Sequence, residues 1–308
     1  MTSEPSLRPL EGGWSGETFL SDFAGERSVV RLFAGPRHNP QAAQIQASLH
    51  RLVAGLVPVP QVREVRLADP ATGTPAMLIT EFVDGVRGDL LLAELGGDDR
   101  YTAGAALGEV AGTLSRIPML RAGTFLDPDL RVEPFELWLP DWLERYADRL
   151  GLAADELGRL REVVDEVAET LAEHPRVCLV HSDLNPKNVI LDPDSLTVRA
   201  VVDWEYSHAG HRFTDLGNLV RFDRQPDYLA GVLTGWRQAG LRHAGEATPS
   251  DETMLTLAGG ADLVALIELA ARRTANPVAA RAHRKLRAIA ATGDLAAPVP
   301  DQSSPTHA

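Results

Sequence analysis

The chain has 308 residues and a formal net charge of −13, with 44% hydrophobic and 24% charged residues. This composition is typical of a globular protein with a real core, long enough for one large domain or two smaller ones. A nucleic-acid-binding protein needs a basic footprint that this charge balance lacks, and every apolar run is far short of the ~20 residues of a membrane helix. The sequence therefore predicts neither nucleic acid nor membrane as a partner.

The numbers of cysteines and lysines limit the expected cellular location and the positions at which a lysine could act. The single cysteine, Cys178, excludes an intramolecular disulfide and is expected to pack in the core. Because the N-terminus also lacks the pattern of a signal peptide, we expect a cytoplasmic location. The acidic balance favours cationic partners, although solubility alone would also explain it. Only two of the 30 basic residues are lysines, Lys187 and Lys285, so chemistry that needs a lysine has two places to find it.

The first part of the chain predicts a small lobe rich in strands, residues 1–86. Short β-prone runs alternate with glycine turns, and one helix carries its apolar residues on a single face. A short link at 81–86 is a candidate hinge, and clefts between lobes are common ligand sites. The predicted elements are three strands within 11–35, a helix at 40–54, and strands at about 61–67 and 76–83.

After Gly85 the pattern changes to longer helices and predicts a larger, mainly helical lobe, residues 87–295. The tail at 296–308, rich in Pro, Ser and Thr, is predicted to be disordered. The expected helices are 101–117, 158–173, 261–273 and 278–291, and the expected strands are 177–180, 188–191 and 197–202.

A polar loop after the strand at 177–180 carries the strongest chemical signal. It reads HSDLNPKN, so that Asn188 follows Asp183 by five residues, and Asp203 follows an apolar run fifteen residues later. Phosphoryl transfer needs a carboxylate that orients the attacking hydroxyl and oxygen ligands that hold Mg²⁺. An isolated Asp-x₄-Asn would be ordinary turn chemistry, but the preceding strand and the second aspartate favour a catalytic site.

These motifs resemble the aminoglycoside phosphotransferase family, which has a protein-kinase-like, two-lobed α+β fold. The family's loop reads H-x-D-x-x-x-x-N, and its metal aspartate stands in a hydrophobic-D-[WF]-E context, as in VVDWE here. The resemblance implies that Asp183 is the catalytic base, that Asn188 and Asp203 bind Mg²⁺, and that His181 braces the loop. It also implies that Asp215, in the D-L-G context, holds the loop in place.

The resemblance implies a nucleotide site in the small lobe. Ser15 and Gly16 lie in a glycine turn that could cover the phosphates, although such a turn is also an ordinary hairpin. The segment ending in EFVDG resembles the family's hinge, where backbone groups of Glu81 and Val83 would meet the adenine of ATP, with GTP as an alternative. A plain strand end is the competing interpretation.

Two positions depart from the kinase pattern. Arg31 stands where a lysine usually meets the phosphates, and Gln44 best fits the place of that lysine's glutamate partner. Arginine also binds phosphate, bidentately, so the change does not exclude activity. Lys187 is either a second contact to the γ-phosphate or a solvated loop charge, and Glu205 either assists the metal or faces a cationic substrate.

The sequence thus predicts a Mg²⁺- and ATP-dependent phosphotransferase acting on a hydroxyl of a small molecule, and nothing in it indicates an oligomeric state. An aminoglycoside or other hydroxylated antibiotic is the first expected acceptor, and a metabolite such as an amino alcohol, sugar or amino acid is the second. A catalytically weak nucleotide-binding regulator is the third possibility, because the usual lysine–glutamate pair is missing. Trp138 and Trp142, four residues apart, are expected to pack on a helix rather than wall an acceptor site.

Overall fold

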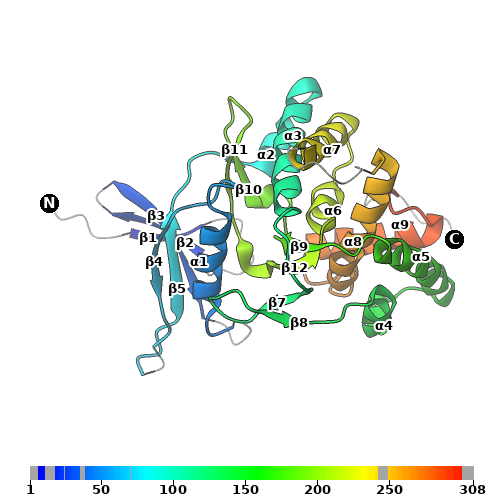
Figure 1. Ribbon diagram of the computed structural model, residues 1–308, viewed down its shortest axis with the longest axis horizontal. Helices are drawn as coiled ribbons and strands as arrows, with labels where there is room; N and C mark the ends of the chain where they lie inside the picture. The colour runs from blue at the N-terminus through cyan, green and yellow to red at the C-terminus, as the bar shows by residue number, and fades with distance from the viewer. Residues whose placement is uncertain are drawn as a thin grey trace.

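A computed structural model describes residues 6–10, 18–23, 25–34, 39–69, 71–241 and 249–299. Figure 1 shows a small lobe built on one β-sheet and a larger lobe made mainly of helices, with β1 and α9 at opposite ends of the molecule. This is the two-lobed α+β architecture that the sequence predicts. Ser15 and Gly16 lie outside the described residues.

The small lobe is a five-stranded antiparallel sheet with one helix. The strand order is β1-β2-β3-β5-β4, formed by β1 (Ser6–Pro9), β2 (Thr18–Phe23), β3 (Glu26–Phe33), β5 (Ala76–Glu81) and β4 (Val62–Arg66).

Helix α1 (Ala42–Val53) joins the sheet to the large lobe and lies between them in Figure 1. Ala43 and Ala47 pack against sheet residues, whereas Ile45, Leu49 and Val53 belong to the main core of the large lobe. Its apolar residues therefore serve two surfaces, which fixes the sheet relative to the large lobe.

The link between the lobes is fastened to the large lobe. It continues into β6 (Val86–Arg87), which pairs with β10 (Val189–Leu191) directly after the polar loop. Gly85 has a φ of +154°, and a Cβ there would lie 2.5 Å from Ile190 Cγ2 and 2.6 Å from the Leu191 carbonyl oxygen. Only glycine permits this approach, so the predicted hinge is held against the strand that follows the loop.

The large lobe has two small sheets and eight helices among its described residues. Sheet β11-β10-β6 contains β11 (Val198–Val201), and sheet β8-β7-β12-β9 contains β8 (Val132–Pro134), β7 (Gly123–Phe125), β12 (His208–His211) and β9 (Val177–Val180). The helices are α2 (Gly88–Glu94), α3 (Gly97–Leu114), α4 (Leu139–Leu150), α5 (Ala154–Ala172), α6 (Thr214–Val220), α7 (Pro226–Leu241), α8 (Asp251–Ala270) and α9 (Pro277–Thr292).

Two cores fill this lobe. One gathers α3, α6, α7 and the sheet residues, and the other lies among α4, α5, α8 and α9. Helices α3 and α7 run side by side in Figure 1, almost in backbone contact, because a Cβ on Gly108 would come within 2.0 Å of the Val232 carbonyl oxygen. Cys178 is fully buried on β9, and burial raises the pKa of its thiol to about 12, as suits a core residue.

Most predicted elements are present with shifted ends, but four helices of the large lobe, α2, α4, α6 and α7, were not among the predicted helices. Helix α8 begins at Asp251, ten residues before its predicted start. Among the described residues α8 also has the length and composition of a membrane span, yet 56% of its apolar window is buried inside the lobe, as for a core helix. The lobe continues past residue 295, since Ala297 is 1% exposed and its carbonyl accepts a hydrogen bond from Lys285 Nζ.

Candidate active site

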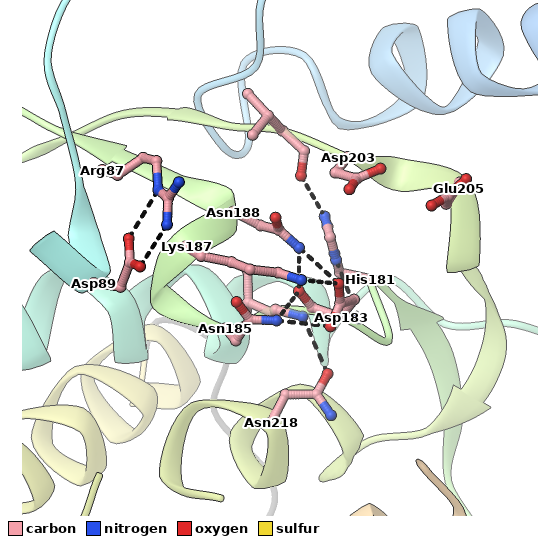
Figure 2. Close-up of polar contacts among 12 residues, drawn as sticks. Arg87, Asp89, His181, Asp183, Asn185, Lys187, Asn188, Asp203, Glu205 and Asn218 are labelled. Carbon is pink, nitrogen blue, oxygen red and sulfur yellow. Dashed lines mark hydrogen bonds and ion pairs between the residues drawn. The ribbon is translucent and has the colours of Figure 1, made fainter. Parts of the chain in front are cut away.

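The polar loop predicted to carry the chemistry starts where the buried strand β9 ends (Figure 2). The Asp215 carboxylate, in the first turn of α6, accepts the backbone N–H of His181 at 2.9 Å and that of Ser182 at 2.8 Å. Burial raises the pKa of Asp215, while His181 and the two N–H donors act against it. These are the contacts that a residue holding the loop in place must make.

A second set of buried groups supports the loop two residues further on. The Leu184 N–H donates to Asn218 Oδ1 (3.1 Å), and Asn218 Nδ2 donates to Asp262 Oδ1 on α8 (2.9 Å). Arg221 holds both oxygens of Asp262, at 2.6 and 2.8 Å, with side chains only 5% and 6% exposed. Sequence reasoning missed this network, although a lone aspartate inside the apolar run of α8 was a signal for it.

Asp183 is held on both carboxylate oxygens. Asn185 Nδ2 donates to Oδ1 at 2.7 Å, and Asn188 Nδ2 donates to Oδ2 at 2.8 Å. Lys187 Nζ lies 3.5 Å from Oδ2, with its side chain 37% exposed. The carboxylate is therefore fixed in direction, and Figure 2 shows the Oδ1 of Asn188 turned away from it. The role of Asn185 was not predicted, since it stands at a variable position of the motif.

Asp203 is brought to the same loop by its neighbours. The Val202 N–H donates to the Asn188 carbonyl oxygen (2.9 Å), and His181 Nε2 lies 3.0 Å from the Val202 carbonyl oxygen. Asp203 itself has a φ of +68°, a left-handed conformation that is costly for a residue with a side chain and is often found at functional sites.

Trp204, directly after Asp203, packs between the two lobes. Its ring lies 4.8 Å from that of His181 and 6.2 Å from that of His50 on α1, both edge-on. Trp204 is 1% exposed. The residue that follows the predicted metal ligand therefore ties the catalytic loop to the small-lobe helix.

Arg31 reaches the site from β3. Its Nη1 lies 2.5 Å from Asp203 Oδ1, and its Nη2 lies 2.6 Å from Glu205 Oε2. Burial acts to lower the pKa of Arg31, but the charges and hydrogen bonds of the two acids outweigh burial and raise the pKa. These partners come from the large lobe, whereas the sequence placed the partner on α1, at Gln44. The buried Nε of Arg31 has no hydrogen-bond partner within the described part of the chain.

The hinge residues lie at the end of β5. The Glu81 N–H donates to the Gln61 carbonyl oxygen at 2.9 Å, and the Glu81 side chain accepts the Gln61 N–H at 3.1 Å. Arg27 makes two hydrogen bonds to Asp84, and its guanidinium lies 4.4 Å from the Phe82 ring centre. The Glu81 N–H is therefore already paired with Gln61.

No cluster of three or more His, Cys, Asp or Glu side chains that could hold a metal is found in the described ranges. A metal at Asp203 and Asn188 would need further oxygen ligands from elsewhere. The oxygens of a nucleotide phosphate are of that hard type, and Mg²⁺ usually binds in this way, with few protein ligands.

Comparisons with known proteins identify the fold. The structure is similar to a microcompartment-associated aminopropanol kinase, with a TM-score of 0.68 and 20% identity over 96% of this chain and 95% of that one. It is also similar to a thermostable mutant of an aminoglycoside phosphotransferase in ternary complex with ADP and hygromycin B, with a TM-score of 0.62 and 18% identity over 95% of each chain. At these identities the likeness establishes the fold, which is that of kinase-like phosphotransferases.

The model of the phosphotransferase enzyme family (APH) matches residues 6–247, so the chain belongs to this family. The family is one of phosphotransferase enzymes. The family resemblance read from the catalytic motifs is confirmed.

Two curated relatives cover parts of the chain. Aminoglycoside 3'-phosphotransferase of Streptomyces fradiae is 28% identical over 169 residues, 54% of this chain and 58% of that one. Acyl-CoA dehydrogenase family member 11 of Mus musculus is 41% identical over 58 residues, 19% of this chain. The chain spans only 7% of the length of that second relative.

Proposed function

We propose that the protein is a kinase that transfers the γ-phosphoryl group of a Mg²⁺-bound nucleoside triphosphate to a hydroxyl of a small molecule. The observation that carries this proposal is the Asp183 carboxylate, fixed by Asn185 and Asn188 beside the loop that bears Asp203. A general base must be oriented before the acceptor arrives, and this one is.

Asp183 accepts the proton of the acceptor hydroxyl as the hydroxyl oxygen attacks the γ-phosphorus. A new O–P bond forms, the bond from phosphorus to the β,γ-bridging oxygen breaks, and the nucleoside diphosphate leaves with that oxygen. Positioning and charge neutralisation supply most of the rate in such reactions. Lys187, 3.5 Å from the Asp183 carboxylate, is close enough to the reacting groups to contact the transferred phosphoryl group.

The residues present fit the metal and the nucleotide. Asp203 and the Oδ1 of Asn188 are hard oxygen ligands of the kind that Mg²⁺ prefers, and the bound ion would neutralise phosphate charge. Arg31 would supply a guanidinium to the phosphates, and its unpartnered Nε is a further donor. The similar aminoglycoside phosphotransferase was crystallised with ADP, which supports nucleotide use. Such an enzyme would work in the cytoplasm, as the sequence predicts.

The decisive experiment replaces Asp183 with asparagine. We expect kcat to fall by about 10²–10⁴-fold, the range for a general base, while the affinity for a non-hydrolysable ATP analogue, measured by calorimetry, stays unchanged. Product formation would be followed by ³¹P NMR. Full turnover by the Asp183→Asn protein would refute the proposed role of Asp183, and loss of nucleotide binding would show that the variant tests folding instead.

Two acceptor classes follow from the family. The similar structures include an enzyme bound to hygromycin B and an aminopropanol kinase, so a hydroxylated antibiotic and a metabolite are both candidates. Expression in a susceptible bacterium separates them, because an antibiotic phosphotransferase raises the inhibitory concentration of its drug. Unchanged susceptibility across aminoglycosides, together with turnover of small alcohols, would select the metabolite class.

A nucleotide-binding regulator is the second candidate function. It is supported by the ion pairs of Arg31 with Asp203 and Glu205, because Asp203, the predicted metal ligand, is paired with an arginine in this structure. Binding of Mg·ATP measured by thermal shift, without turnover of any alcohol in a broad panel, would favour the regulator. Turnover that depends on Asp183 would exclude it.

A further inference from the structure

The two acids that pair with Arg31 lie on one short segment of the large lobe. Asp203 comes directly before the short helix η2 (Trp204–Tyr206), and Glu205 is the second residue of that helix. Figure 2 shows the two carboxylates next to each other on this segment. Their side chains are 32% and 21% exposed, whereas that of Arg31 is 10% exposed. A ligand can therefore still reach both acids while they hold the arginine.

The segment that carries Glu205 is anchored by its neighbour Trp204. The Trp204 side chain is 1% exposed, and its Nε1 donates to the Val201 carbonyl oxygen at 3.0 Å. The Trp204 carbonyl oxygen accepts the Ser207 N–H at 3.3 Å, which closes the single turn of η2. A close-packed aromatic ring has little room to move. Glu205 therefore projects from a fixed point of the large lobe toward β3.

The guanidinium group of Arg31 is divided between the two acids, with one nitrogen for each. Its Nη1 lies 2.5 Å from Asp203 Oδ1, and its Nη2 lies 2.6 Å from Glu205 Oε2. An arginine beside a single carboxylate commonly binds both of its oxygens. Arg221 does so with Asp262, through Nε at 2.8 Å and Nη2 at 2.6 Å. Glu205 thus takes a nitrogen that could otherwise bind the second oxygen of Asp203.

The oxygen that Arg31 leaves alone is the one that matters for a metal. Oδ2 of Asp203 has no hydrogen-bond partner within the described ranges, because Arg31 contacts only Oδ1. A carboxylate with one oxygen paired can still bind an ion through the other. A carboxylate held on both oxygens by one guanidinium group would offer Mg²⁺ no oxygen without first breaking a charged hydrogen bond.

We propose that Glu205 is a positioning residue for the metal site. By binding Nη2 of Arg31, it prevents Arg31 from taking both oxygens of Asp203 and keeps Oδ2 available to the ion. The inference rests on the proposed function, in which Asp203 binds Mg²⁺. It differs from both roles that the sequence suggested for Glu205, because Glu205 acts here through Arg31 and contacts neither the metal nor a cationic substrate.

The test measures metal binding rather than turnover. Mn²⁺, which prefers the same oxygen ligands as Mg²⁺, is titrated into the protein with a non-hydrolysable ATP analogue and followed by electron paramagnetic resonance. Glu205→Ala should raise the half-saturating Mn²⁺ concentration about tenfold or more, because groups that orient metal ligands are typically worth 10–100-fold in affinity. Binding of the analogue without metal, measured by calorimetry, should stay within about threefold and shows that the variant is folded.

A second substitution separates this role from direct metal binding. Arg31→Gln removes the group that competes for Asp203, so adding Glu205→Ala to Arg31→Gln should change the Mn²⁺ affinity by less than about threefold. The four proteins form a double-mutant cycle that measures the coupling between the two residues. Glu144→Ala, which removes an exposed acid paired with Arg161 on another surface, is the matched control and should change nothing in either background.

An equal loss of Mn²⁺ affinity with and without Arg31 would make Glu205 a metal ligand and overturn the inference, and so would an unchanged affinity in Glu205→Ala. If the alanine variant does not bind the analogue at all, the near-isosteric Glu205→Gln replaces it in the same cycle. Failure of the underlying function would look different. In that case Asp203→Asn would leave Mn²⁺ binding unchanged, or turnover would not depend on Asp183, whichever way the cycle came out.

Discussion

The polar loop that carries Asp183 is held by buried groups of α6 and α8, whereas Arg31 reaches Asp203 and Glu205 from the small lobe through ion pairs. In the ion pair that supports the loop from α8, the side chains of Arg221 and Asp262 are 5% and 6% exposed. In the ion pair between the lobes, the side chains of Arg31 and Asp203 are 10% and 32% exposed. The loop is thus organised before any ligand binds. Arg31 contacts only Oδ1 of Asp203, which leaves the second carboxylate oxygen for a metal.

The largest expected effect comes from breaking the support behind the loop. Asp262→Ala leaves Arg221 charged and buried without its partner, a change that costs about 3–5 kcal/mol. Urea unfolding should show this loss of stability, and Arg161→Ala at an exposed ion pair should show little change. An Asp262→Ala protein as stable as the wild type would mean that the buried pair does not hold the fold.

The next effect concerns the loop itself. Asp215→Asn presents an amide N–H₂ to one of the two backbone N–H groups that the carboxylate accepts. An unsatisfied buried donor costs about 1–3 kcal/mol, and we expect kcat to fall about tenfold or more as Asp183 loses its alignment. Steady-state kinetics with nucleotide affinity as the control would measure this. Unchanged kcat in a stably folded variant would show that the loop holds its shape without Asp215.

A smaller effect is expected on the small-lobe side. Arg31→Lys can keep one of the two acid partners but not both in the same geometry, because an ammonium is a point charge. We expect the nucleotide KM to rise several-fold, to about tenfold, with kcat within a factor of about three and stability almost unchanged. A fall in kcat at constant KM would instead place Arg31 among the groups that act only in the transition state.

A last effect, confined to acid pH, compares buried histidines of the two lobes. Burial lowers the pKa of His211 on β12 to about 4 and also lowers the pKa of His50 on α1. In the unfolded chain a histidine takes up its proton near pH 6.5, so the unfolded state binds more protons between pH 6.5 and 4. Stability should therefore be complete above about pH 6.5 and fall as the pH drops toward 4.

Replacing His211 with glutamine should remove part of this acid-side loss, roughly 1–3 kcal/mol between the two pH values. Urea unfolding at pH 4.5 and pH 7.5 gives the difference directly. If the variant and the wild type lose the same stability on acidification, His211 does not contribute to the slope, and the remaining buried histidines, His50 among them, must account for it.

Sequence patterns predicted the loop well because its chemistry is local. Asp183, Asn188 and the strand before them lie within a dozen residues. Helix periodicity identified α3, α5, α9 and the second half of α8, but not α2, α4, α6 or α7. The start of α8 at Asp251 could have been predicted from the sequence. Ser250 is a favourable N-cap residue, whose side chain accepts the Thr253 N–H, and acidic residues follow it in the first turn. The partners of Arg31 were not predictable, because they lie 172 and 174 residues away and depend on how the two lobes meet.

The support of the loop by α8 has a consequence for the order in which the protein is made. Asp262 is 44 residues beyond Asn218 in the chain, so during synthesis the whole motif leaves the ribosome before the α8 part of its support exists. Because domains fold as units from the N-terminal end, a nascent chain stalled before α8 would carry a complete motif on a loop that lacks the contact of Asn218 with Asp262. Competence for phosphoryl transfer should therefore appear only after α8 has emerged.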